Sequence, residues 1–293
     1  MDTSLPVAPI SLPPEPHYRP VKKGAWSASV LGVGAAFGAG AFFAAQMAFG
    51  AAGFIPLLGA YGALIAWSVD RRRKMVDCVR ENDDAVALLN AGDVAKAEST
   101  FEHLIRKSRA NPGYNALFVY NRGVAFLRRG EFDRAISLFH AVLDSGWLNS
   151  SRMPFRPLLF SGLATAHALR GDLHAAQHWL HQAHATVSHA KRGALLLADA
   201  IVAVRTGRPR DALAMMDAGW AQAEGVLSAI QVRTLRLLRA FAMEQLPPAP
   251  GLDEEIQRQL LAVRPFPPGA YDYVGASWPE FAHFLRRHGL TSR

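Results

Sequence analysis

The 293-residue chain has a single cysteine, Cys78, so it cannot form an intramolecular disulfide. One unpaired thiol suits a reducing compartment. The sequence also has no phosphate-binding glycine loop, no HExxH metal motif, no nucleophile elbow and no CxxC pair. These absences exclude the usual sequence signatures of nucleotide hydrolases, metalloproteases, serine hydrolases and thiol oxidoreductases. We therefore expect a protein that is not an enzyme, with no cofactor and no metal.

Charge is missing over one long stretch, because residues 24–69 contain no Asp, Glu, Lys or Arg. A membrane-spanning helix needs about 20 apolar residues, so this stretch is long enough for two. The sequence GAAG at Gly50–Gly53 supplies a turn between them. The sequence thus predicts a transmembrane hairpin over residues 25–69, with helices near Ala25–Ala48 and Phe54–Val69. A buried hairpin of a soluble protein and a cleaved signal peptide are the two alternatives.

Basic residues stand on both sides of this stretch, Lys22 and Lys23 before it and RRRK at 71–74 after it. Residues 1–74 hold seven Lys/Arg and three Asp/Glu, and the rest of the chain holds 25 and 21, so basic character is densest here. Basic flanks favour the cytoplasmic side, which places both termini and the remaining chain in the cytoplasm. The alanine- and arginine-rich composition is typical of a bacterial protein, so we expect the bacterial inner membrane.

Residues 1–24 form a proline-rich tail, with six prolines among the first 20 residues, and should not fold. After the hairpin, residues 75–246 are expected to form a helical-repeat domain, and residues 247–293 a linker with C-terminal helices. No Gly or Pro occurs between Gly62 and Ala91. The second membrane helix could therefore continue into the first repeat helix, with Asn82–Asp84 as the expected break because these residues can cap helices.

The repeat has three recurring features. A glycine ends one helix-period stretch at Gly92, Gly130, Gly171 and Gly207. Five residues later stands a small residue, at Ala97, Ala135, Ala176 and Ala212. Nine residues after the glycine stands a large apolar one, at Phe101, Phe139, Leu180 and Met216. The glycines are 38, 41 and 36 residues apart, intervals that are typical of stacked helical hairpins.

This pattern resembles the tetratricopeptide repeat family over about residues 78–224. The second copy carries the best match, in Gly123, Phe126, Gly130, Phe132, Ala135 and Phe139. The other copies have Ala85, Ala164 and Ala200 in place of Gly123. The resemblance implies an all-α solenoid, here a TPR-like one behind a two-helix membrane hairpin. It also implies binding of a protein partner.

In that family the first helix of each hairpin lines a concave groove. Carried over to this sequence, the resemblance implies a groove formed by Asn82, Asn90, Tyr120, Arg128, Ser161, Thr165, Leu197 and Arg205. The full face is mixed and more apolar than charged, which fits a partner helix or an extended apolar peptide. Ordinary packing between helices is the alternative for each residue. We therefore expect a membrane-anchored adaptor, or else an oligomerising structural subunit of an envelope or secretion assembly, joined through the hairpin.

His174, His178 and His181 fall on one side of a helix at spacings of four and three. Because Ala176 and Leu180 face the opposite way, we expect this stripe to be solvated, with a metal- or pH-responsive surface as the alternative. Cys78 is expected to be a small, half-buried residue. Mixed surface charge gives no dense basic stripe for nucleic acid.

A terminal helix is indicated by Trp278, Phe281, Phe284, Leu285 and His288 at helical spacing. Ser277 is expected to be its N-cap. The connector before it, residues 264–277, is expected to be flexible enough to let the helix return to the repeats. There it would act either as a cap or as an occupant of the groove.

Overall fold

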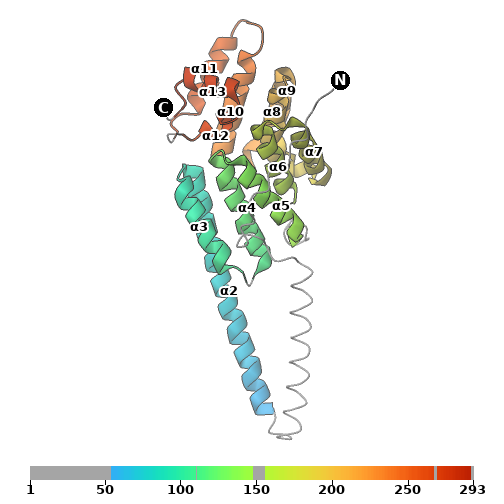
Figure 1. Ribbon diagram of the computed structural model, residues 1–293, viewed down its shortest axis with the longest axis vertical. Coiled ribbons are helices and arrows are strands. Elements are labelled where there is room, and N and C mark those ends of the chain that lie inside the picture. The colour runs from blue at the N-terminus through green and yellow to red at the C-terminus, as the bar shows by residue number, and fades with distance from the viewer. Residues whose placement is uncertain (1–53, 110, 148–155, 267–268, 292–293) are drawn as a thin grey trace.

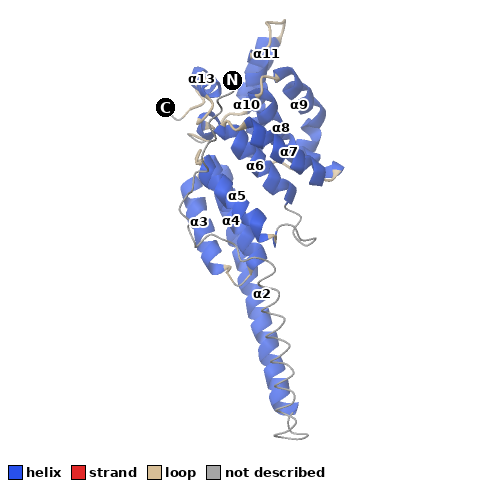
Figure 2. Cartoon of the chain, turned by 45° about the vertical axis from the view of Figure 1, so that its right-hand side comes forward, coloured by secondary structure: helices blue, strands red, loops and turns tan. Residues whose placement is uncertain are grey.

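The computed structural model describes residues 54–109, 111–147, 156–266 and 269–291. Within these ranges every regular element is helical (Figure 2). In chain order the elements are α2 (Phe54–Ala91), α3 (Val94–Lys107), α4 (Pro112–Arg128), α5 (Phe132–Ser145), α6 (Arg156–Arg170), α7 (Leu173–Thr186), the 3-10 helix η4 (His189–Leu195), α8 (Leu196–Arg205), α9 (Pro209–Glu224), α10 (Ala229–Glu244), α11 (Leu252–Ala262), α12 (Asp272–Gly275) and α13 (Pro279–Arg287). The predicted all-α fold class is confirmed for these residues.

Consecutive helices pair into hairpins, α2 with α3, α4 with α5, α6 with α7, α8 with α9 and α10 with α11 (Figure 1). The four repeat glycines form the turns, because Gly92, Gly130, Gly171 and Gly207 have φ values of 93°, 77°, 104° and 72°. Residues with a Cβ rarely adopt this left-handed conformation. The turns predicted from the sequence are therefore confirmed.

The small and large repeat positions form the core. All four alanines are fully buried, and the large residues that follow them are 0–9% exposed. At Gly123 a Cβ atom would lie only 2.6 Å from the Phe139 ring, so α4 and α5 can approach here only without a side chain. The equivalent Ala85, Ala164 and Ala200 are also fully buried.

Helix α2 runs without interruption through residues 82–84, so the break expected there is wrong. The physical reason is that the Asn82 side chain does not cap its own helix. Its carbonyl oxygen accepts a 2.7 Å hydrogen bond from the Asn121 amide on α4. The first repeat helix is therefore the continuation of the helix that begins at Phe54.

The first part of α2, residues 54–77, extends beyond the other described helices and is called the stem here (Figure 1). Its exposed apolar side chains include Ile65, Trp67, Val69 and Val76. No helix in the described part of the chain is long and apolar enough to cross a membrane. The proline-rich tail and the predicted helix Ala25–Ala48 lie outside the described residues, so the membrane hairpin stays a prediction.

The C-terminal helices lie at the end of the molecule opposite the stem (Figure 1). The connector that we expected to be flexible instead contains α12, and Tyr271 at its start is fully buried, with its ring centre 5.4 Å from that of Phe266. Burial raises the pKa of Tyr271 to about 12. The expected N-cap of α13 is also wrong, because Trp278 and not Ser277 precedes the first helical residue.

Candidate functional site

The eight predicted groove residues lie on the first helices of the hairpins, α2, α4, α6 and α8. The structure divides them by what they contact. Two take part in the packing of the helices, one bridges neighbouring hairpins, two are covered by the C-terminal residues, and three remain on the surface.

Asn82 and Leu197 are the two packing residues. Asn82 is 7% exposed and is held by its hydrogen bond to Asn121. Leu197 is 8% exposed and belongs to the hydrophobic core. Their side chains hold the repeats together, as the packing alternative for these positions anticipated.

Tyr120 links α4 to the next hairpin. Its ring centre lies 5.3 Å from that of Phe139, and its hydroxyl donates a hydrogen bond of 3.4 Å to the carbonyl oxygen of Leu158 on α6. Burial raises the pKa of Tyr120 to about 12, so the hydroxyl stays protonated and remains a donor. Its main contact is thus with the core.

Asn90, Ser161 and Thr165 form the surface group. Asn90 is exposed near the end of α2, and the two hydroxyl residues are half-buried on α6. None of the three side chains makes a hydrogen bond to another described residue. These are the polar groups of the first-helix face that a partner could satisfy.

Arg128, the last residue of α4, contacts Tyr273 of α12. Its Nη1 donates a hydrogen bond of 2.8 Å to the Tyr273 hydroxyl, and its Cζ lies 4.8 Å from the centre of the ring. Close by, a Cβ at Gly130 would stand 3.1 Å from the Cβ of Ala276. The residues around α12 therefore lie directly on the turn between α4 and α5.

Arg205, the last residue of α8, joins α6 to the C-terminal residues. It donates hydrogen bonds to the carbonyl oxygens of Ala168 and Leu169 at the end of α6, which satisfies acceptors that a helix terminus leaves free. It also donates to the carbonyl oxygen of Ser277, and its Cζ lies 5.2 Å from the centre of the Trp278 ring. Burial lowers the pKa of this guanidinium, opposed in part by the charge of Glu280.

Residues 269–291, called the C-terminal segment here, are anchored on α10 by aromatic side chains. The Phe241 ring centre lies 5.3 Å from that of Trp278, 5.0 Å from that of Phe281 and 5.3 Å from that of Phe284. Near the end of α10, Glu244 accepts a hydrogen bond from Arg287 and lies 2.6 Å from Nε2 of His288. The prediction that the terminal helix, α13, packs against the helical domain of residues 75–246 is confirmed by these contacts with α10.

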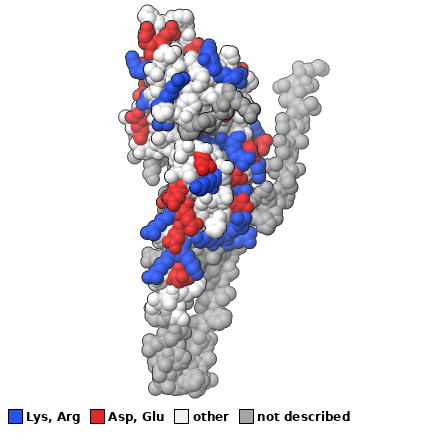
Figure 3. Space-filling view, turned by 90° about the vertical axis from the view of Figure 1, so that its left-hand side faces the viewer, with Lys and Arg blue, Asp and Glu red and all other residues white. Residues whose placement is uncertain are grey.

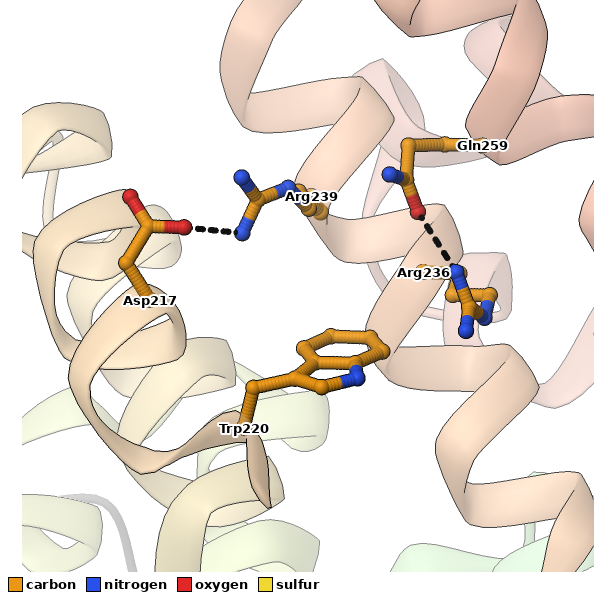
Figure 4. Close-up of a pocket in the computed structure, with 5 residues that line it drawn as sticks. All are labelled: Asp217, Trp220, Arg236, Arg239 and Gln259. Carbon is orange, nitrogen blue, oxygen red and sulfur yellow. Dashed lines mark hydrogen bonds and ion pairs between the residues drawn. The ribbon is translucent and has the colours of Figure 1, made fainter. Parts of the chain in front are cut away.

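A pocket of about 260 Å³ lies between α9, α10 and α11. Figure 4 shows its lining, with Asp217 and Trp220 from α9, Arg236 and Arg239 from α10, and Gln259 from α11. The two arginines are three residues apart; the Arg239 guanidinium is directed toward Asp217 (Figure 4), and the Arg236 guanidinium carbon lies 4.8 Å from the centre of the Trp220 ring. This pocket combines two cations with an aromatic face.

Comparison with known proteins supports the resemblance to tetratricopeptide repeats. Residues 83–150 and residues 120–186 each match the profile of the tetratricopeptide repeat family. Over residues 83–186 the chain is therefore similar to tetratricopeptide repeats. No curated protein and no solved structure matches the chain. The matched residues extend from the end of α2 through α7, so the pocket, Arg205 and the C-terminal segment lie beyond the tetratricopeptide match.

Sequence reasoning missed the pocket, although a signal was present. Arginines recur at every third position of α10, at Arg233, Arg236 and Arg239, which brings them to one side of the helix. Arg233 uses this placement to donate a hydrogen bond of 3.0 Å to the carbonyl oxygen of Pro265. The other two line the pocket.

The remaining candidate residues are placed as follows. His174, His178 and His181 are exposed on α7, as expected for a solvated stripe. Among the described residues, no group of three His, Cys, Asp or Glu side chains is arranged to hold a metal ion. Cys78 is fully rather than half buried, and burial raises the pKa of its thiol, which disfavours the reactive thiolate.

The surface carries both signs of charge. On the face shown in Figure 3, Lys and Arg side chains lie next to Asp and Glu side chains along the helical body. A more buried group joins α3 to α4, where Glu98 pairs with Arg122 at 3.5 Å and with Arg129 at 2.5 Å. The exposed pairs contribute little stability, because water screens their charges.

Proposed function

We propose that this protein is an adaptor that holds a protein partner on the first-helix face of its tetratricopeptide repeats. The observation that carries the proposal is the surface group on that face. Asn90, Ser161 and Thr165 offer polar atoms without a hydrogen-bond partner among the described residues, and Val86 on α2 and Val124 on α4 are half-buried. Such a mixed surface suits an amphipathic helix or an extended apolar peptide.

We propose further that residues 25–69 hold the adaptor at a membrane, with the repeats on the cytoplasmic side of a bacterial inner membrane. The charge-free sequence with basic residues on both sides supports this proposal. Exposed apolar residues on the stem, Ile65, Val69 and Val76, also support it, because lipid or another protein surface would bury them favourably.

The same apolar residues favour a second candidate function, a structural subunit that oligomerises through the stem and the hairpin. In that case the repeats would stiffen an assembly instead of selecting a partner. The two functions differ in which surface contacts another protein. The surface is the first-helix face in one and the stem in the other.

Site-specific photocrosslinking in native membranes tests the partner face. A photoreactive residue at Thr165 or Asn90 should capture one defined protein, whereas the same residue at Gln177, which is exposed on α7, should not. Equal capture from Gln177 would contradict the assigned face. Capture of a second copy of the chain from Val69 or Val76, with none from Thr165, would favour the structural subunit.

Carbonate extraction and protease digestion test the membrane proposal. The protein should stay in the membrane pellet after carbonate treatment. A protease added to sealed inverted vesicles should digest the repeats, because their cytoplasmic side faces outward. Release by carbonate would overturn the anchor, and digestion in spheroplasts but not in inverted vesicles would overturn the orientation.

A further inference from the structure

The pocket between α9, α10 and α11 is separate from the first-helix face. Its lining consists of Asp217, Trp220, Arg236, Arg239 and Gln259. None of these residues comes from α2 to α8, on which the groove residues lie. A ligand in this pocket would therefore not compete directly with a partner on the groove.

Arg236 is held loosely by its polar neighbours. Its Nη1 donates to Oε1 of Gln259 at 3.3 Å, and its Nη2 lies 3.4 Å from Oε1 of Glu224. Both distances are beyond the usual range for a strong hydrogen bond to a charged group. The guanidinium carbon lies 4.8 Å from the centre of the Trp220 ring, so the aromatic face fixes its position more than the hydrogen bonds do.

Arg239 has one close partner. Its Nη1 lies 2.5 Å from Oδ1 of Asp217, and its Nε is buried with no hydrogen-bond partner among the described residues. The Asp217 side chain is 62% exposed, so this carboxylate is well hydrated and its ion pair contributes little stability. An incoming carboxylate could share or replace it at small cost.

The donors of the two arginines exceed the acceptors around them. Each guanidinium carries five N–H donors, and three hydrogen bonds to Gln259, Glu224 and Asp217 account for the contacts of both groups. A carboxylate is planar and accepts two parallel hydrogen bonds, the geometry that arginine matches best. A phosphate dianion fits less well, because Asp217 already places one negative charge in the lining. The apolar face of Trp220 suits an adjoining aliphatic stem.

We propose that this pocket binds a carboxylate from an acidic segment of a protein partner. Arg236 and Arg239 donate the hydrogen bonds, and Trp220 contacts the aliphatic part of the bound residue. The carboxylate can be that of a Glu or Asp side chain or of a chain terminus. The pocket gives the protein a second recognition site, beyond the proposed groove.

A peptide titration of the full-length protein in non-ionic detergent tests the site. The readout is the indole N–H signal of Trp220 in NMR spectra, assigned with a Trp220→Phe variant. Three hexapeptides serve as probes: one with both ends blocked and two central glutamates, its glutamine counterpart, and the glutamine peptide with a free C-terminal carboxylate. The first or the third should shift the signal, which also distinguishes a side-chain from a terminal carboxylate. The blocked glutamine peptide should not.

Substitutions test whether the two arginines bind the peptide. Arg236→Gln or Arg239→Gln should weaken binding about tenfold or more, the effect of losing one charge-assisted hydrogen bond. Arg210→Gln, an exposed charge at the other end of α9, removes the same charge and should leave binding unchanged. Asp217→Asn should tighten binding roughly two- to fivefold, because it removes a weak competing ion pair.

The proposal is overturned if no probe shifts the Trp220 signal, or if the blocked glutamine peptide binds as well as the glutamate peptide. Equal binding by the parent protein and the two arginine variants would also overturn it. Thr165→Arg, on the groove face, should leave this titration unchanged. Failure of the groove proposal and failure of the pocket proposal can therefore be told apart.

Discussion

The repeat hairpins and the C-terminal part of the molecule, α10 to α13, close their cores in different ways. In the repeats a small residue faces a large one, as where the Phe139 ring lies against the Cα of Gly123. In the C-terminal part rings face rings, with Phe241 against Trp278, Phe281 and Phe284. A repeat buries its face against the next repeat, whereas the last one needs a different element to cover it. The aromatic C-terminal segment supplies that cover.

The C-terminal part also limits the groove. The C-terminal segment reaches back to the ends of α4 and α8 through Tyr273 and Trp278, which contact Arg128 and Arg205. At this end of the first-helix face, the two arginines already bind residues of the C-terminal segment. The terminal segment is therefore both a cap on α10 and a boundary of the surface left for a partner.

The largest expected effect is in the repeats. Ala135→Arg should destabilise the fold by about 3–5 kcal/mol, because a long side chain and an unpaired charge would enter a fully buried site. The control Gln177→Arg, at an exposed position of α7, should change stability by less than about 0.5 kcal/mol. Urea unfolding followed by circular dichroism measures both. A stable Ala135→Arg protein would contradict the small-against-large packing.

The C-terminal counterpart is Phe281→Ala. Phe281 is fully buried between Phe241 and Phe284, so its truncation should cost about 3–4 kcal/mol. Leu261→Ala is the control, since Leu261 is 69% exposed and should tolerate the change. If the two variants behave alike, the C-terminal segment is not part of the cooperative fold. A separate early transition in Phe281→Ala would show that the cap unfolds before the repeats.

A third substitution tests how closely α4 and α5 approach each other at Gly123. Gly123→Ala should destabilise by about 1–2 kcal/mol, because its Cβ would stand 2.6 Å from the Phe139 ring and overpacking outweighs the better helix propensity. Gly219→Ala in α9 meets only the flexible end of Leu196 at 3.2 Å, so it should be neutral or slightly stabilising. Phe139→Leu should offset part of the Gly123→Ala loss. Equal effects at both glycines would show that propensity, not packing, decides.

The repeats could be predicted because their pattern is local. Gly130 lies in the turn before α5, and Ala135 and Phe139 lie in α5 itself. These three positions are close in sequence, so their spacing is visible without a structure. The capping chemistry was less well predicted. Asn82 and Ser277 are residues that often cap helices, but Asn82 bonds to Asn121 on α4, and α13 begins one residue later than expected, after Trp278. At Asn82 a tertiary partner overrode the local preference.

Long-range contacts could not be predicted in the same way. Arg128 and Tyr273 are 145 residues apart in sequence, and no periodic signal connects them. The pocket likewise joins Trp220, Arg236 and Gln259 from three helices. Its arginine spacing was visible in the sequence, but the facing tryptophan was not. Sites made by the stacking of different hairpins therefore need the structure, whereas the hairpins themselves do not.

The smallest expected effect is the pH dependence of stability, which histidines in both regions contribute to. Burial lowers the pKa of His140 and His167 in the repeats and, with the charges of Arg287 and Arg264, that of His288 in the C-terminal segment. These pKa values lie below the unfolded value of about 6.5. The unfolded chain therefore binds more protons than the folded chain as pH falls through this range, and stability decreases with falling pH.

His288→Gln should reduce this pH dependence in the C-terminal part, and His167→Gln should reduce it in the repeats. The measurement is the free energy of unfolding between about pH 8 and about pH 5.5, a range that spans histidine titration. Glu244 lies 2.6 Å from His288, but Arg287 pairs with the same carboxylate, which limits its ability to favour the charged imidazole. If the parent protein instead becomes more stable as pH falls, Glu244 outweighs burial and the two arginines. The C-terminal segment would then be held more tightly in acid, the reverse of the expected result.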